Sequence, residues 1–226
     1  MVQTLSAQEI TLEKLREKFN LELVKNDKFF PEWQYELPEI SAGEKQRLDR
    51  VQTSYSNLLE EPPILENTVK MVVLSPLLDL ANLYLPPFRI KSEKTIKISL
   101  EDEGIIIKGK IDVLAVCEQI WVMAIESKKA AFSLEVGRSQ LLTYMLANPN
   151  SNQATYGLIT NGNSFRFLKL VKGETSQYAV SRIFDIFNPG NDLYHVLSIL
   201  KSLANLALNS PPFLNREVGN SIMDNG

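Results

Sequence analysis

Two acidic residues and one lysine have the types and spacing needed for metal-assisted hydrolysis. Asp112 lies within one apolar segment, and Glu126 and Lys128 end the next apolar segment along the chain. Two carboxylates with a backbone carbonyl form a hard oxygen site suited to Mg²⁺. Such an ion lowers the pKa of a bound water and neutralises charge on a phosphate, and a nearby ammonium can orient the attacking water. The three residues therefore indicate phosphodiester chemistry.

Three consecutive strands are expected to position these side chains. They span residues 89–100, 104–117 and 120–128, are rich in Ile and Val, and are separated by short turn-like links. Short links favour an antiparallel meander. Because strand side chains alternate, Glu126 and Lys128 project from one face, and a hairpin partner can bring Asp112 onto that face.

A purely structural interpretation competes with this one. Charged residues at strand ends are usually solvated or paired with each other, and an Asp…Glu-x-Lys pattern occurs by chance in many chains. The strand that ends at Glu126, however, is apolar on both faces and becomes charged abruptly at its end. Burying ionisable groups there is unfavourable unless they have a function, which favours the catalytic interpretation.

The pattern of apolar residues in the rest of the chain predicts helices before and after these strands in the sequence. It indicates an α/β (α+β) fold with three parts. Residues 1–60 are expected to form an N-terminal helical extension, residues 61–210 the main domain, and residues 211–226 a loose tail. The expected helices span 11–19, 41–58, 65–85 (interrupted by Pro76), 134–146 and 193–206, and the further strands span 155–160, 165–170 and 178–184.

Four motifs, in order along the chain, resemble a known family. They are Gly-Lys-Ile-Asp-Val-Leu at 109–114, Trp-Val-Met-Ala-Ile-Glu-Ser-Lys at 121–128, Gln-Leu-Leu-Thr-Tyr at 140–144 and Tyr-Gly-Leu-Ile-Thr-Asn-Gly at 156–162. This order resembles the N-terminal nuclease domain of type I restriction enzyme R subunits, a PD-(D/E)XK nuclease, over roughly residues 60–190. The resemblance implies a restriction endonuclease-like fold: a central mixed sheet with an antiparallel three-stranded meander, flanked by helices.

The resemblance also implies roles for individual residues. Asp112 and Glu126 would bind Mg²⁺, with Mn²⁺ as a possible substitute, together with the carbonyl of Ser127. Lys128 would be the catalytic lysine. Glu66 matches the glutamate on the family's first helix, which often adds a direct or indirect metal contact.

The family's QxxxY helix motif is matched by Gln140 and Tyr144, whose i, i+4 spacing places both on one helical face, where they can position DNA or water. Two departures leave the catalytic groups intact: Ile111 stands where proline is typical, and Ser127 where an apolar residue is common. The sequence also has no Walker-type loop, so it resembles a stand-alone relative without the helicase motor.

The overall charge is weakly acidic, with a net charge of −3 and a pI near 5.4, so a generally basic nucleic-acid-binding chain is excluded. Lys108, Lys110, Lys129 and Arg138 flank the expected site; they are equally well explained as phosphate contacts or as ordinary solvated charge. The single cysteine, Cys117, and the lack of an export signal or long apolar run favour a cytoplasmic protein away from membranes.

Three hypotheses for function follow. The first is Mg²⁺-dependent hydrolysis of DNA phosphodiester bonds, of restriction or DNA-processing type, as a homodimer or with separate helicase or methylase subunits. The second is a catalytically silent nuclease-fold module that binds DNA or acts as a scaffold. The third is cleavage of RNA or of a repair intermediate.

Overall fold

The strands form one mixed sheet between two groups of helices. The computed structural model describes residues 3–100, 105–117, 120–129, 131, 133–150 and 153–209. Within this part of the chain, nine strands lie in one sheet of order β1-β4-β5-β6-β7-β8-β2, with β3 paired to β4 and β9 to β7. The strands are β1 (Gln3–Ser6), β2 (Leu21–Leu23), β3 (Phe88–Leu100), β4 (Ile105–Cys117), β5 (Ile120–Ser127), β6 (Thr155–Thr160), β7 (Ser164–Val171), β8 (Ser176–Val180) and β9 (Phe184–Asp185).

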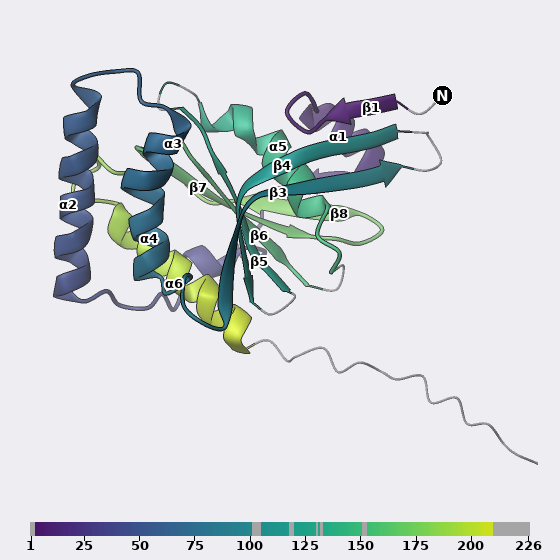
Figure 1. The fold of residues 1–226 in the computed structure, drawn as a ribbon. Coiled ribbons are helices and arrows are strands. Elements are labelled where there is room, and N and C mark those ends of the chain that lie inside the picture. The colour runs from purple at the N-terminus through teal and green to yellow at the C-terminus, as the bar shows by residue number, and fades with distance from the viewer. Residues whose placement is uncertain are drawn as a thin grey trace, which may run out of the picture.

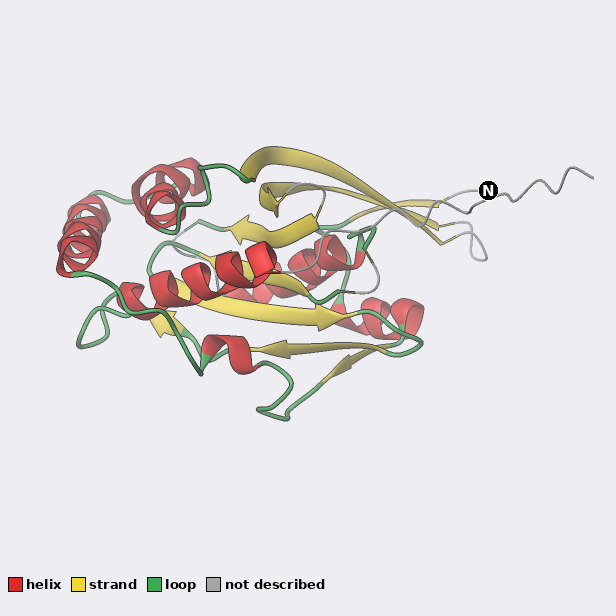
Figure 2. Cartoon of the chain, turned by 90° about the horizontal axis from the view of Figure 1, so that it is seen from below, coloured by secondary structure: helices red, strands yellow, loops and turns green. Residues whose placement is uncertain are grey.

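Helices cover both faces of this sheet, as Figure 2 shows. One face packs against α2, the α3-η2-α4 segment and α6, and the other packs against α1 and α5. The helices are α1 (Leu12–Phe19), η1 (Pro31–Trp33), α2 (Ala42–Leu59), α3 (Glu66–Val69), η2 (Lys70–Leu74), α4 (Ser75–Leu80), α5 (Leu134–Leu146) and α6 (Leu193–Asn209). Alternate residues of the central strands enter the two cores, as the period of two requires.

Strand β4 has different partners along its two edges. One edge pairs with the antiparallel strand β3 over almost its whole length. The other edge pairs in parallel with β1 at Ile105–Lys108 and antiparallel with β5 at Val113–Cys117. Neither β1 nor β5 pairs with the four residues between these stretches, 109–112. Among the described strands, this short part of the β4 edge therefore has no strand partner; it is called the open edge of β4 below. Figure 1 shows the long β3-β4 ribbon crossing the molecule and continuing beside β1.

Residues 1–60, expected to form an N-terminal helical extension, also contain two short strands. β1 and β2 are strands at opposite ends of the sheet order, and both pair in parallel with strands from later in the chain. The helix predicted from Ser41 is present as α2, which begins with a capping box between Ser41 and Glu44. It buries Leu48 and Tyr55 in the main core, so this part of the segment is integral to the fold.

Two other predicted elements are divided in the structure. The helix expected over 65–85 contains a π-helical turn, η2, just before Pro76. Because proline lacks an N–H and clashes with the preceding turn, a wider π turn lets the helix continue. The strand expected over 178–184 is interrupted after Val180 and resumes as β9. The predicted loose tail, 211–226, lies outside the described residues. No described helix combines the length and apolarity needed to cross a membrane.

Candidate active site

The two acids predicted from the sequence lie at the point where β4 and β5 separate. Val113 pairs with Ile125, so the next position in the same antiparallel register places Asp112 opposite Glu126. Directly opposed residues of an antiparallel pair share a face, with Cβ atoms about 5 Å apart. The Ser127 N–H donates to Oδ2 of Asp112 at 2.8 Å, which fixes this carboxylate beside the end of β5.

Glu126 is buried, with a relative exposure of 2%. Its Oε1 accepts a hydrogen bond from Nζ of Lys128 at 2.5 Å, while its Oε2 is buried with no hydrogen-bond partner in the described structure. Burial, and then the nearby charge of Asp112, raise the pKa of Glu126 to about 8, although Lys128 acts in the opposite direction. Burial therefore favours the protonated, uncharged form of this carboxyl group.

Helix α5 supplies the next groups of the site. Nζ of Lys128 donates to Oε1 of Gln140 at 2.9 Å, and Nε2 of Gln140 donates to the hydroxyl of Tyr144 at 2.6 Å. The backbone of Lys110, on the open edge of β4, also donates to this hydroxyl. Burial, and then the charge of Glu126, raise the pKa of Tyr144 above its usual value, so the phenol stays protonated. The QxxxY residues thus link β5 to the edge of β4.

A glycine allows this helix to approach closely. A Cβ added at Gly137 would lie 3.2 Å from Cε of Lys128 and 3.3 Å from a methyl carbon of Ile159, closer than ordinary packing. A larger side chain would therefore move α5 away from the lysine that Gln140 holds.

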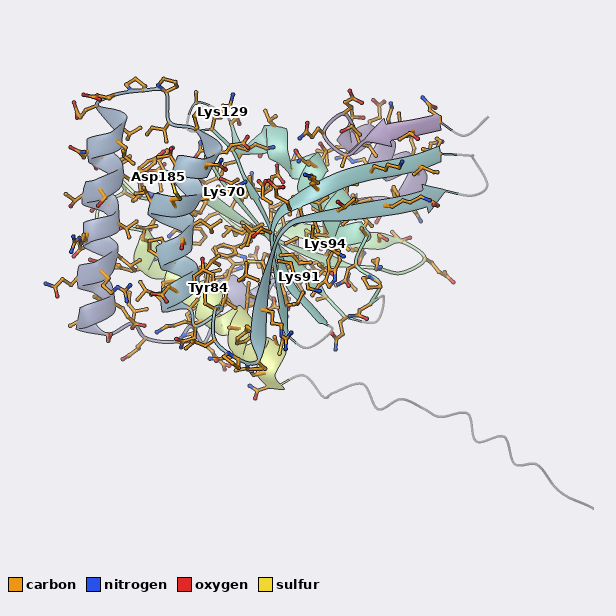
Figure 3. The ribbon with its side chains drawn as sticks, in the orientation of Figure 1. Lys70, Tyr84, Lys91, Lys94, Lys129 and Asp185 are labelled. Atoms are coloured by element: carbon orange, nitrogen blue, oxygen red, sulfur yellow. The ribbon has the colours of Figure 1, made fainter. Side chains whose placement is uncertain are left out.

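Sequence reasoning missed one charged residue of the site, Lys70. Its Nζ lies 2.9 Å from Oδ1 of Asp112, and both side chains are mostly buried. Lys70 begins the π turn η2, and Figure 3 shows it on the helical side of the crossing of β3 and β4. Glu66, four residues earlier, lies close enough to raise the pKa of Glu126 by charge repulsion. The i, i+4 spacing of Glu66 and Lys70, which places both on one helical face, was the signal available in the sequence.

The residues present fit a magnesium ion that keeps part of its water shell. Among the described residues, no three His, Cys, Asp or Glu side chains are grouped as a ready metal site. Mg²⁺, however, is usually held by one or two carboxylates and several waters. The unpartnered Oε2 of Glu126 and the opposed Asp112 supply the carboxylates. The N–H and C=O of one strand residue point to the same side, so the Ser127 carbonyl is directed toward this gap as well.

The predicted phosphate contacts differ in their surroundings. Lys108, Lys110 and Lys129 are exposed, and Lys110 has an ion pair with Glu93 at 3.2 Å. Arg138 lies 2.8 Å from Glu135 on the same helix, an acid that also pairs with Arg166 at 2.6 Å, and the Arg138 side chain is only 22% exposed. The structure thus gathers Asp112, Glu126, Ser127, Lys128, Gln140, Tyr144 and Glu66 into one site and keeps Arg138 in an intramolecular pair.

Comparison of the sequence with models of known protein families gives no match, and comparison with curated proteins gives none either. The functional argument therefore depends on the geometry of the site itself.

Proposed function

We propose that this protein is a Mg²⁺-dependent deoxyribonuclease of the PD-(D/E)XK type that cuts phosphodiester bonds within DNA. The main support is that Asp112 lies opposite Glu126 at a break in the sheet, with Lys128 hydrogen-bonded beside them. The antiparallel pairing of β3 with β4 and of β4 with β5, with α5 following, is consistent with the meander of a restriction endonuclease-like fold.

The lysine has the geometry of a positioning and charge-neutralising group. An ammonium has three donors, and Lys128 uses two of them on Glu126 and Gln140. The third can donate to the attacking water or to a non-bridging phosphate oxygen. As the water oxygen bonds to phosphorus and the bond to the leaving oxygen breaks, this fixed positive charge offsets the negative charge that builds on the phosphate.

The carboxylates would hold the metal through Asp112, Glu126 and the Ser127 carbonyl. When bound, Mg²⁺ supplies a Lewis acid and an acidified water. To hold such an ion, Glu126 would have to be ionised and Asp112 would have to give up its contact with Lys70. The Lys70 ammonium, beside the site, could then donate to a phosphate oxygen.

Plasmid cleavage tests this proposal. Supercoiled plasmid is incubated with Mg²⁺ or Mn²⁺ and wild type, Asp112→Asn, Lys128→Met or the control Lys28→Ala, which changes an exposed lysine far from the site. Loss of a metal or lysine contribution is expected to lower the nicking rate by about 10²–10⁴-fold in the two site variants and not in the control. Equal nicking by wild type and Asp112→Asn would reject the assigned site.

One observation favours the alternative of a silent DNA-binding or scaffold module. Each acid already has a lysine partner, Lys70 for Asp112 and Lys128 for Glu126, so both carboxyl groups are held in place without a metal. A thermal unfolding titration separates the two proposals. A nuclease site gives a Mg²⁺-dependent rise in melting temperature that Asp112→Asn abolishes, whereas a silent module gives no rise in either protein.

A further inference from the structure

A second groove lies along β4, on the side of the site where β1 ends. It has a volume of about 440 Å³. Its lining includes two lysines, four hydroxyl side chains and one amide, and no acidic side chain. The lining residues are Thr4, Leu5, Ser6, Gln8, Thr95, Lys108, Gly109, Lys110 and Tyr144. Ammonium, hydroxyl and amide groups are the donors that proteins use on phosphate oxygens.

The groove reaches the proposed site at Tyr144, and its two lysines lie on the same strand as Asp112. The groove follows the open edge of β4 and passes the backbone N–H of Lys110, which donates to Tyr144. Two residues after Lys110 on the same strand is Asp112. At about 3.3 Å per strand residue, Lys110 and Lys108 lie about 7 Å and 13 Å from Asp112 along the strand. Phosphates of one DNA strand rise about 3.4 Å per step along the helix axis, so these distances span about two to four steps.

Strands β3 and β4, beside the groove, carry a net positive charge, whereas the whole chain is negative. β3 and β4 carry six Lys and Arg side chains and only two acidic ones, while the chain has a net charge of −3. Lys97 pairs directly with Lys108 across the ribbon, and both are exposed. Like charges directly opposite each other destabilise a sheet, and an anion bound between them relieves this repulsion. The pair of Lys110 with Glu93 is exposed on both sides, so it exchanges easily for a phosphate.

Gly109 allows Ala7 and Tyr144 to lie close against the backbone of β4. A Cβ at this position would lie 2.7 Å from Cβ of Ala7 and 2.8 Å from Cε1 of Tyr144. Because side chains alternate along a strand, Lys108 and Lys110 both extend from the other face of β4.

We propose that this groove binds the phosphodiester backbone of the DNA strand to be cut, a few phosphates away from the scissile bond, through Lys108 and Lys110. The inference rests on the proposed function and deepens it, because it assigns the residues that hold the DNA strand on one side of the scissile bond. A mononucleotide or a dinucleotide reaches the carboxylates but leaves the groove empty, so it is cut poorly.

Binding without metal tests the groove independently of catalysis. Fluorescence anisotropy with a labelled DNA duplex of about 25 base pairs in EDTA compares wild type, Lys108→Ala/Lys110→Ala and the control Lys28→Ala across a salt series. The double variant is expected to bind at least about tenfold more weakly and to lower the slope of log K against log salt by roughly 1.8, since each phosphate contact contributes about 0.9. Affinity and slope equal to wild type, or an equal loss in Lys28→Ala, would overturn the proposal.

The outcomes for the groove and for the nuclease are distinguishable. Loss of DNA binding in the double variant without any metal-dependent cutting by wild type would keep the groove and reject the nuclease. Metal-dependent cutting with unchanged binding by the double variant would keep the nuclease and reject the groove. A parallel series with RNA of the same sequence, if bound more tightly than DNA, would contradict the assigned polymer.

Discussion

The buried carboxyl of Glu126 gives a pH dependence of stability that the substitution Glu126→Gln removes. Burial raises its pKa from 4.5 to about 8, so the folded protein keeps a proton that the unfolded chain releases. By linkage, stability falls as pH rises from about 4.5 to about 8 and levels off above that. Glutamine has a similar shape and its amide oxygen still accepts from Lys128, but it does not ionise.

The size of the effect follows from the size of the shift. Each pKa unit corresponds to 1.36 kcal/mol, so the wild type would lose roughly 4–5 kcal/mol over this range relative to Glu126→Gln. Relaxation of the site reduces this figure, and we expect a difference of at least about 2 kcal/mol between about pH 5 and about pH 8.5. The side chain is only 3% exposed, so solvent screens little of it.

Urea unfolding at both pH values, with and without Mg²⁺, measures the effect. Glu39→Gln, on an exposed loop, is the matched control. Mg²⁺ at about 100 times its dissociation constant should restore about 2.7 kcal/mol to the wild type at the higher pH and nothing to Glu126→Gln. If the difference between wild type and Glu126→Gln is the same at both pH values, the reasoning about the buried carboxyl is refuted.

Three further predictions concern the neighbours of this carboxyl. Lys70→Met removes a cation that competes for Asp112, so Mg²⁺ affinity measured by calorimetry should rise about tenfold; an unchanged or lower affinity contradicts this. Gly109→Ala places a Cβ 2.8 Å from a ring carbon of Tyr144 and should cost about 1–3 kcal/mol in denaturant unfolding. Tyr144→Phe leaves the Gln140 amide without its acceptor and should cost a similar amount; wild-type stability of either variant refutes the assigned contact.

Several elements of the fold, and the position of Asp112 opposite Glu126, could be predicted from local sequence patterns. Helix α5 and strand β6 have the bounds expected from their apolar patterns and end signals. The sequence around Asp112 and Glu126 predicts two strands joined as a hairpin, and the antiparallel pairing of β4 with β5 places the two acids opposite each other. Such signals are contained in short windows of sequence, where alternation and turn residues are decisive.

The features that sequence reasoning missed depend on contacts between distant segments. β2 is only three residues long, and it forms by pairing with β8, more than a hundred residues later. Its short window has no strand signal of its own. The contact of Lys70 with Asp112 joins a helix to a strand forty-two residues away, and the π turn that aims the lysine arises from a proline six residues later. Secondary-structure propensity predicts neither which distant strand a short segment pairs with nor the direction in which a side chain such as Lys70 points.

The open edge of β4 connects the proposed chemistry with the proposed substrate path. A strand edge left unpaired inside a sheet exposes backbone N–H groups, and here one of them is satisfied by the buried Tyr144 hydroxyl. If β1 continued along β4, it would cover both this N–H and the approach to Asp112. On the proposed function, the early end of β1 at Ser6 would leave the approach along β4 toward Asp112 and Glu126 free for a DNA strand.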